Sequence, residues 1–167
     1  MVIRDSSYPR LPRLYWGEVI YATPGSGKTY VANKYRDVVD GDELIVEAIR
    51  EVKSHSFQIG HYNDPREVIF RYFRYVNFSR KYMWQVYNVA IRKMRKACNI
   101  QDVVLIGTVD LMSEADRIFV QREDYYVRNG FNQIRETDEV DNTSYDVPVH
   151  YTCEYLDNTL QQTCREL

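Results

Sequence analysis

The chain has 167 residues, of which 44% are hydrophobic and 14% aromatic, and its formal net charge at pH 7 is −2. This length and apolar content predict one domain, residues 1–167, with a substantial core. The near-neutral charge argues against a general nucleic-acid-binding protein, although a local basic face and a nucleic-acid partner stay open.

Cysteine usage and hydropathy indicate the compartment. The three cysteines are widely spaced and form no Cys-x-x-Cys pair, which is typical of a reducing compartment without a disulfide framework or zinc site. Residues 1–13 contain no apolar stretch of the secretory type, and no apolar run approaches the length of a membrane span. We therefore expect a cytoplasmic protein with no membrane contact.

The first predicted elements are an extended arm and a strand that leads into a glycine-rich turn. Residues 1–14 are polar and punctuated by two prolines, and residues 18–22 form a short apolar run. A helical pattern starts at Tyr30. Between strand and helix, glycines would let successive backbone N–H groups point at one anion, and the helix N-terminus would add partial positive charge. The residues expected to bind phosphates are Pro24, Gly25, Ser26, Gly27, Lys28 and Thr29.

Two side chains of this loop carry specific chemistry. Lys28 is expected to reach the β- and γ-phosphates of a nucleoside triphosphate, and the Thr29 hydroxyl to ligate Mg²⁺. Ala22 stands where the usual motif has glycine, a mild change because the glycines at the tightest part of the turn are present. The alternative is a plain glycine-rich turn, but the flanking strand and helix favour phosphate binding.

Two aspartates follow the second predicted strand, residues 37–40. Asp40 and Asp42 are separated by one glycine, and residues 44–52 have the apolar spacing of a helix. One carboxylate could hold Mg²⁺ through a water while the other orients or deprotonates an acceptor. The alternative is a simple turn, since Asp-Gly is common in turns for backbone reasons.

Residues 53–100 are predicted to form a helical region that contacts the acceptor. One helix is expected to begin at Pro65 with Asp64 as its cap, and a longer one to cover residues 80–98. The basic residues between 92 and 96 are expected to be solvated, with contact to a polyanion as the alternative. Arginines of the first helix could bind the acceptor or simply face solvent; they are Arg66, Arg71 and Arg74.

The second half of the chain supplies three further strands. The buried run at residues 103–106 predicts one, and Asp110 follows it, where it could associate with Mg²⁺ or cap the next segment. Residues 117–120 predict another. Residues 147–152 predict a last strand at an edge of the sheet, because Pro148 cannot donate to a ladder. A closing helix is expected within residues 154–167.

Residues 121–145 are expected to form a lid and a mobile loop, with a helix over 122–129 and an acidic loop over 136–144. Arg122 and Arg128 lie in this stretch. Arginines on a lid could neutralise charge on a transferring phosphoryl group. The alternative is that they pair on the surface with nearby acidic residues.

Strands that alternate with helices predict an α/β domain built on a parallel sheet of about five strands. In such sheets ligands bind at the carboxyl ends of the strands. The phosphate loop, the Asp40 and Asp42 pair and Asp110 all follow strand ends, so we expect them to share one site.

The loop at residues 22–29, followed by Val-Val-Asp-Gly-Asp-Glu-Leu at residues 38–44, resembles the small phosphate-loop kinases. These are nucleotide and nucleoside kinases, with shikimate-kinase-like, gluconate-kinase-like and polynucleotide 5′-kinase relatives. The resemblance covers about residues 17–46. It implies a three-layer α/β/α fold, ATP–Mg²⁺ as the phosphoryl donor, phosphate binding by residues 25–29, and a role for Asp40 or Asp42 near the metal and the acceptor.

Together these features predict an ATP-dependent phosphotransferase, with a nucleoside monophosphate or nucleoside as the first choice of small acceptor. A helicase-like NTP-hydrolysing motor domain and a nucleotide-binding structural module without chemistry are the alternatives. The identity of the acceptor and the oligomeric state stay open. The expected catalytic residues are Lys28, Asp40, Asp42, Arg122 and Arg128, and the expected Mg²⁺ ligands are Thr29, Asp42 and Asp110.

Overall fold

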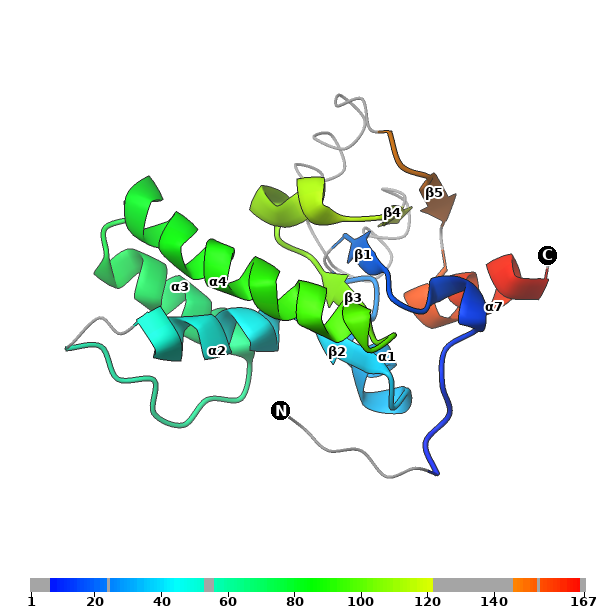
Figure 1. Cartoon of the computed structure of the whole chain (residues 1–167), viewed down its shortest axis with the longest axis horizontal. Coiled ribbons are helices and arrows are strands. Elements are labelled where there is room, and N and C mark those ends of the chain that lie inside the picture. The colour runs from blue at the N-terminus through cyan, green and yellow to red at the C-terminus, as the bar shows by residue number, and fades with distance from the viewer. Residues whose placement is uncertain (1–6, 24, 53–55, 122–145, 153, 166–167) are drawn as a thin grey trace. The chain divides into compact units, whose positions relative to one another are not determined.

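The computed structural model describes residues 7–23, 25–52, 56–121, 146–152 and 154–165. Figure 1 shows the elements in chain order. They are η1 (Arg13–Tyr15), β1 (Val19–Ala22), α1 (Lys28–Lys34), β2 (Val38–Asp40), α2 (Gly41–Val52), α3 (Pro65–Tyr75), α4 (Arg80–Asn99), β3 (Val103–Ile106), η2 (Val109–Glu114), β4 (Arg117–Gln121), β5 (Val149–Thr152) and α7 (Leu156–Arg165).

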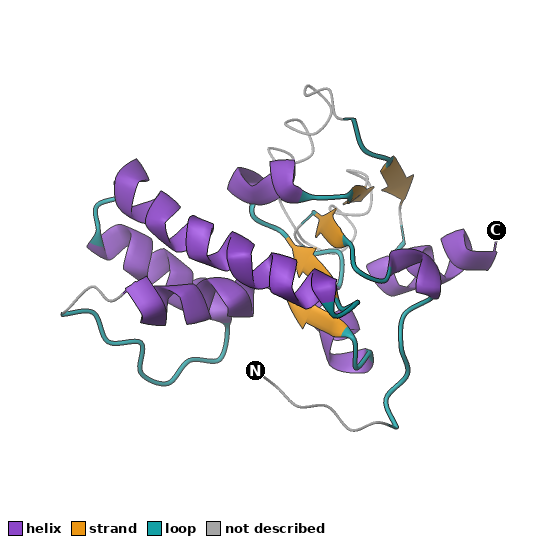
Figure 2. Cartoon of the chain, viewed as in Figure 1, coloured by secondary structure: helices purple, strands orange, loops and turns teal. Residues whose placement is uncertain are grey.

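The strands form one sheet in the order β2-β3-β1-β4-β5, and every neighbouring pair is parallel (Figure 2). The predicted α/β class with a parallel five-stranded sheet is therefore confirmed, and it is compatible with a three-layer arrangement. β5 lies at an edge, as the proline before it indicated. The central strands β1 and β3 are buried along their whole length, as expected for a parallel sheet covered on both faces.

The chain forms two compact units, one made of residues 1–40 with 97–167 and the other of residues 41–96. The first unit contains the sheet. Ile20, Leu105 and Phe119 extend from three of its strands into a cluster with Val31 of α1 and Leu160 of α7. Because β-strand side chains alternate between faces, these contacts place α1 and α7 on the same side of the sheet.

The described part of the N-terminal arm packs on this first unit. The Arg36 N–H donates to the Pro9 carbonyl at 2.9 Å, and the Leu11 N–H donates to the Asp37 carboxylate at 3.0 Å. Leu11 itself is buried. The segment is therefore held both by its backbone polar groups and by an apolar anchor.

The second unit contains α2, α3 and most of α4. α3 begins at Pro65, and Asp64 accepts a hydrogen bond from the Arg66 N–H at 3.0 Å, which confirms the predicted proline start and aspartate cap. The rings of Phe73 and Tyr87 meet edge to face, with centroids 5.4 Å apart, so α3 and α4 pack through aromatic contacts.

Local structure differs from the sequence prediction at the start of α2 and at the short helices η1 and η2. α2 begins at Gly41, directly after β2 and three residues before the helix expected over residues 44–52, so Asp42 lies in the first turn of a helix and not in the simple turn that was the alternative. Carboxylates are favoured there by the unpaired N–H groups of the helix start. The short helix η2 was not predicted, because six residues are too few to show a helical repeat.

The helix expected over residues 122–129 and the acidic loop over 136–144 lie outside the described residues. Among the helices that are described, none combines the length and the apolar character needed to cross a lipid bilayer.

Candidate nucleotide-binding site

The loop between β1 and α1 turns on two glycines. Gly25 has φ = 80° and Gly27 has φ = 96°, the left-handed region in which a side chain would strain the backbone. Lys28 and Thr29 follow at once as the first residues of α1. Pro24 lies outside the described residues. The other five predicted phosphate-binding residues are contiguous and lie at the carboxyl end of β1.

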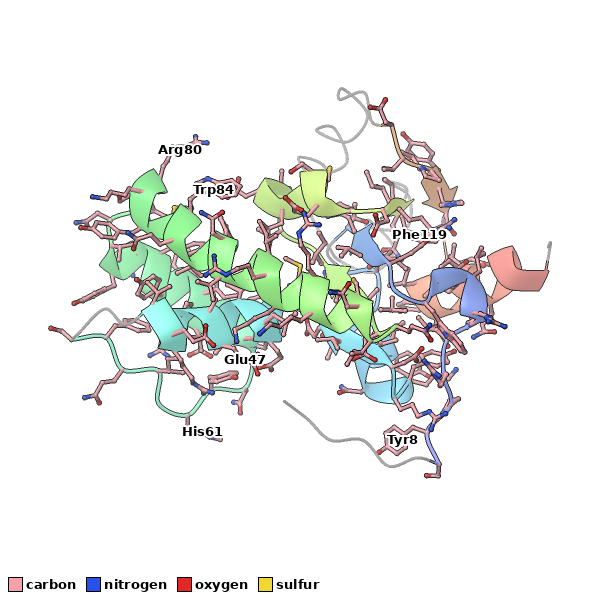
Figure 3. The ribbon with its side chains drawn as sticks, viewed as in Figure 1. Tyr8, Glu47, His61, Arg80, Trp84 and Phe119 are labelled. Carbon is pink, nitrogen blue, oxygen red and sulfur yellow. The ribbon has the colours of Figure 1, made fainter. Side chains whose placement is uncertain are left out.

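Hydrogen bonds tie this loop to β4 and to α7. The Thr23 N–H donates to the carbonyl of Phe119, labelled in Figure 3, at 3.2 Å, and the Thr23 hydroxyl accepts from the Gln121 N–H at 3.1 Å. On the other side, the Leu156 N–H at the start of α7 donates to the Ser26 carbonyl at 2.7 Å. The loop is thus ordered by elements distant in sequence before any ligand arrives.

The Lys28 side chain reaches the end of β3. Lys28 is only 9% exposed, and a Cβ added at Gly107, the first residue after β3, would lie 2.8 Å from Lys28 Cε and overlap its Nζ. The amine therefore lies against the Gly107 backbone. A side chain at this position would therefore displace the end of the Lys28 side chain.

The chain leaves β1 and β3 in opposite directions across the sheet. β1 leads through α1 to β2 on one side, whereas β3 leads through η2 to β4 on the far side of β1. Such a reversal opens a crevice at the carboxyl ends of adjacent parallel strands, where ligands bind. The glycine loop, Lys28 and Gly107 all lie at this reversal point.

Two buried polar atoms beside the loop have no hydrogen-bond partner within the described part of the chain. They are Ser26 Oγ and Gln121 Oε1, and their residues are 2% and 1% exposed. Leaving a buried polar group unpaired costs about 1–3 kcal/mol. The Ser26 hydroxyl could donate to a phosphate oxygen, so the unpaired atom and the glycine turn both fit an anionic group held in this loop.

An exposed aromatic ring borders the loop. A Cβ added at Gly27 would lie 3.6 Å from the ring of Tyr155, and Tyr155 is 51% exposed. The residue immediately precedes α7, which the Leu156 hydrogen bond attaches to the loop. A ring held this way offers a flat apolar face next to the expected phosphate position.

Hydrogen bonds from the end of α1 to Asp157 of α7 hold the two helices that flank the loop together. Asp157 is 9% exposed and accepts hydrogen bonds from Lys34 Nζ at 2.7 Å and from the Tyr35 hydroxyl at 2.6 Å. The hydrogen bond to Asp157 raises the pKa of Lys34, and burial together with the same carboxylate raises the pKa of Tyr35. Both groups therefore stay protonated, and both stay donors, across the neutral range.

The predicted aspartates lie in three different elements. Asp40 is the last residue of β2 and pairs in register with Leu105, so it lies at the same sheet edge as Gly107. Asp42 is 7% exposed in the first turn of α2, which belongs to the second unit. Asp110 is exposed in the first turn of η2, where Thr108 is the N-cap residue.

Several predicted roles concern residues or ions that the structure does not test. Arg122 and Arg128 lie outside the described residues. Within residues that are described, no group of three or more His, Cys, Asp or Glu side chains is arranged to hold a metal ion. The assignments of Thr29, Asp42 and Asp110 to Mg²⁺ stay predictions; Thr29 is exposed at the start of α1, open to a ligand at the loop.

Sequence reasoning did not identify two residues of this site. Gly107 carried a usable signal, since a glycine directly after a buried strand indicates a close backbone approach. Tyr155 carried none, because its position depends on how α7 docks against the loop. Comparisons of the chain with protein-family models, with curated proteins and with solved structures found no match.

Proposed function

We propose that this chain is an ATP-dependent phosphotransferase that moves the γ-phosphoryl group to a small acceptor, with nucleosides and nucleoside monophosphates as the first candidates. The observation that carries the proposal is the position of Lys28. Its amine lies against Gly107 at the carboxyl end of β3, beside the turn in which Gly25 and Gly27 have positive φ, where the strand order reverses. A fixed cation and a curled backbone at a strand reversal are the features that bind a triphosphate.

The loop residues have separate tasks in this proposal. Gly25 and Gly27 permit the turn, Lys28 neutralises charge between the β- and γ-phosphates, and the Thr29 hydroxyl contributes to the Mg²⁺ shell. ATP–Mg²⁺, when bound, supplies the transferable phosphoryl group. Phosphoryl transfer needs in-line alignment and charge neutralisation more than covalent chemistry from the protein.

Asp40 supports transfer to an acceptor in addition to nucleotide binding. It ends β2 at the same edge of the sheet as the loop, with β3 between them. A carboxylate there would take the proton of an acceptor hydroxyl as that oxygen bonds to phosphorus and the bond to the β-phosphate oxygen breaks. An acceptor phosphate, already anionic, would need no base.

Tyr155 supports a nucleotide as the ligand of the loop in preference to a simple phosphate. An exposed tyrosine ring beside the phosphate-binding turn is a surface on which a nucleobase can stack. Stacking of one base on an aromatic side chain contributes about 1–3 kcal/mol. The ring would orient the donor without selecting strongly among bases.

The decisive experiment incubates the protein with γ-labelled ATP, Mg²⁺ and a pooled panel of nucleosides, monophosphates, sugars and 5′-hydroxyl oligonucleotides, and identifies the labelled product. We expect one acceptor class to become labelled, and we expect Lys28→Ala to lower turnover by orders of magnitude while its unfolding curve stays cooperative. Lys96→Ala is the control, because it removes an exposed lysine of α4 that has no part in the loop or in its contacts with α7.

Other outcomes would contradict the proposal in recognisable ways. ATP hydrolysis that no acceptor captures, but that single-stranded nucleic acid stimulates, would indicate a motor domain. Tight ATP binding without turnover across the whole panel would indicate a structural nucleotide-binding module. Absence of ATP binding would overturn the assignment of the loop itself.

A further inference from the structure

The helices α3 and α4 carry a charge opposite to that of the whole chain. Residues 65–99 contain nine lysines and arginines and one acidic residue, a local net charge of +8 in a chain whose total is −2. The remainder of the sequence is therefore strongly acidic. Net positive charge is therefore concentrated on two consecutive helices, where a polyanion would be attracted.

The cations of this segment differ in whether the protein supplies them with a partner. Several have partners in the protein: Lys93 Nζ lies 2.6 Å from the Glu51 carboxylate, Arg66 pairs with Asp64 at 3.1 Å, and Arg71 donates to a backbone carbonyl. Arg74, Arg80 and Lys81 are exposed and form no ion pair with any other residue that the structure describes. These three gather where α3 ends and α4 begins, and Figure 3 shows Arg80 extending away from the ribbon there.

Aromatic rings are exposed among these cations. Phe70, Tyr75, Phe78 and Tyr82 are 57%, 46%, 50% and 44% exposed, all within the same stretch of the two helices. The rings of Phe70 and Phe78 meet with centroids 5.9 Å apart. Single exposed apolar residues are ordinary, but four aromatic rings interleaved with cations that form no ion pair with described residues are not.

The turn between the helices holds one of these rings outward in a strained backbone. α3 ends in a Schellman motif, in which the Phe78 N–H donates to the Phe73 carbonyl at 2.7 Å and the Asn77 N–H donates to the Arg74 carbonyl at 2.9 Å. Asn77 has φ = 56°, which asparagine tolerates, but Phe78 has φ = 53°. A left-handed conformation costs a residue with a side chain about 1–2 kcal/mol. Retaining a large ring in this conformation, exposed to solvent, points to a role for the ring beyond packing.

We propose that this hairpin surface, defined by Phe70, Arg74, Phe78, Arg80, Lys81 and Tyr82, binds single-stranded nucleic acid. The guanidinium and ammonium groups would neutralise successive phosphates, and the rings would stack on unpaired bases. Proteins that bind single strands combine these two kinds of contact. A duplex hides its bases from such rings, and the proposal therefore specifies a single strand. It does not depend on the phosphotransferase activity proposed above.

Fluorescence anisotropy with a labelled oligonucleotide of about 12 nucleotides tests the proposal, a length within the range that one single-strand-binding module covers. We expect binding at low salt, for DNA or RNA, that weakens linearly with the logarithm of salt concentration. Arg80→Gln with Lys81→Gln should reduce that slope by about 1.4, since each neutralised phosphate of a single strand contributes about 0.7. The matched control is Arg92→Gln with Lys96→Gln, which removes the same charge farther along α4, outside the hairpin surface, and should leave the slope unchanged.

Phe78→Gly separates loss of binding from loss of folding. Glycine adopts φ = 53° without strain, so this variant should unfold at the same temperature as the wild type or higher, while losing the stacking ring. We expect its affinity for the oligonucleotide to fall about 5- to 150-fold, the equivalent of one stacked base. Unchanged affinity in a folded Phe78→Gly protein would overturn the proposal.

Three further results would also overturn it. The first is no binding of the oligonucleotide at low salt. The second is equal weakening by the hairpin variant and the control variant, which would mean that only overall charge matters. The third is tighter binding to a duplex, or to phosphatidylserine vesicles, than to the single strand, which would assign the surface to another partner.

Discussion

Substituting Gly107 by alanine moves the Lys28 amine without removing it. The added Cβ would lie 2.8 Å from Lys28 Cε, closer to Nζ, and 3.4 Å from the Ala22 carbonyl oxygen. Of these contacts only the one with Ala22 is an ordinary van der Waals distance. The end of the lysine side chain must therefore shift, and it can do so because its terminal bonds rotate freely.

The expected effects on folding and on binding differ in size. Overpacking a core costs about 1–3 kcal/mol, and the low end applies here because the displaced group is the flexible tip of one side chain. Such a loss would lower the melting temperature of a chain this long by about 2–4 °C. Loss of a charge-assisted contact with phosphate costs about 1.5–3 kcal/mol, so ATP should bind about 10- to 150-fold more weakly.

Isothermal titration calorimetry with a non-hydrolysable ATP analogue and Mg²⁺ measures the binding change, and differential scanning calorimetry measures the stability change. Gly60→Ala is the matched control. Gly60 has φ = 64° with no atom within 4 Å of an added Cβ, so alanine strains the backbone there without touching Lys28. It should lower the melting temperature and leave ATP affinity unchanged.

A double substitution tests whether Lys28 mediates the effect. In a Lys28→Ala background, Gly107→Ala should weaken ATP binding little further, because the group that it displaces is already absent. Affinity within twofold of wild type in the Gly107→Ala protein would refute the placement of Lys28 in the phosphate site. Fully additive losses in the double variant would show that Gly107 acts by another route.

Three further predictions concern the surroundings of the loop. Tyr155→Ala should weaken ATP binding about 5- to 150-fold while Tyr155→Phe retains it, since the ring and not the hydroxyl stacks on the base; equal losses would exclude stacking. Asp157→Asn weakens the hydrogen bonds from Lys34 and Tyr35, which should cost about 1.5–3 kcal/mol and lower the melting temperature by about 3–12 °C. An unchanged melting temperature would mean that these hydrogen bonds add nothing to stability. The pKa of His150 is lowered by burial and by the neighbouring Arg117 guanidinium, so the unfolded chain binds the proton more readily than the folded protein does. The free energy of unfolding should therefore fall as the pH drops below about 6.5 through the folded-state pKa. In unfolding curves recorded over a series of pH values, His150→Gln should remove this dependence.

Sequence patterns correctly predicted those elements whose signals lie within a few consecutive residues, such as β3 and the start of α3. The apolar run at residues 103–106 became β3 because a continuous buried run is typical of a parallel strand covered on both faces. Pro65 and Asp64 predicted the start of α3 because the capping hydrogen bond joins Asp64 to the N–H of Arg66, only two residues further along the chain. Where the local signal was ambiguous, as at residues 40–43, the start of the helix was placed too late: α2 begins at Gly41 and not at residue 44.

The sequence alone determined the class of the fold, the parallel sheet and the glycine-rich turn between β1 and α1, because the signals for helices, strands and turns are carried by residues that are adjacent in the chain. Only the tertiary structure decided which residues face that loop. Gly107 and Tyr155 reach it from positions about 80 and 130 residues away from it, through the order of the strands and the docking of α7. No pattern along the chain encodes such proximity, because it arises from packing between segments that are separate in sequence.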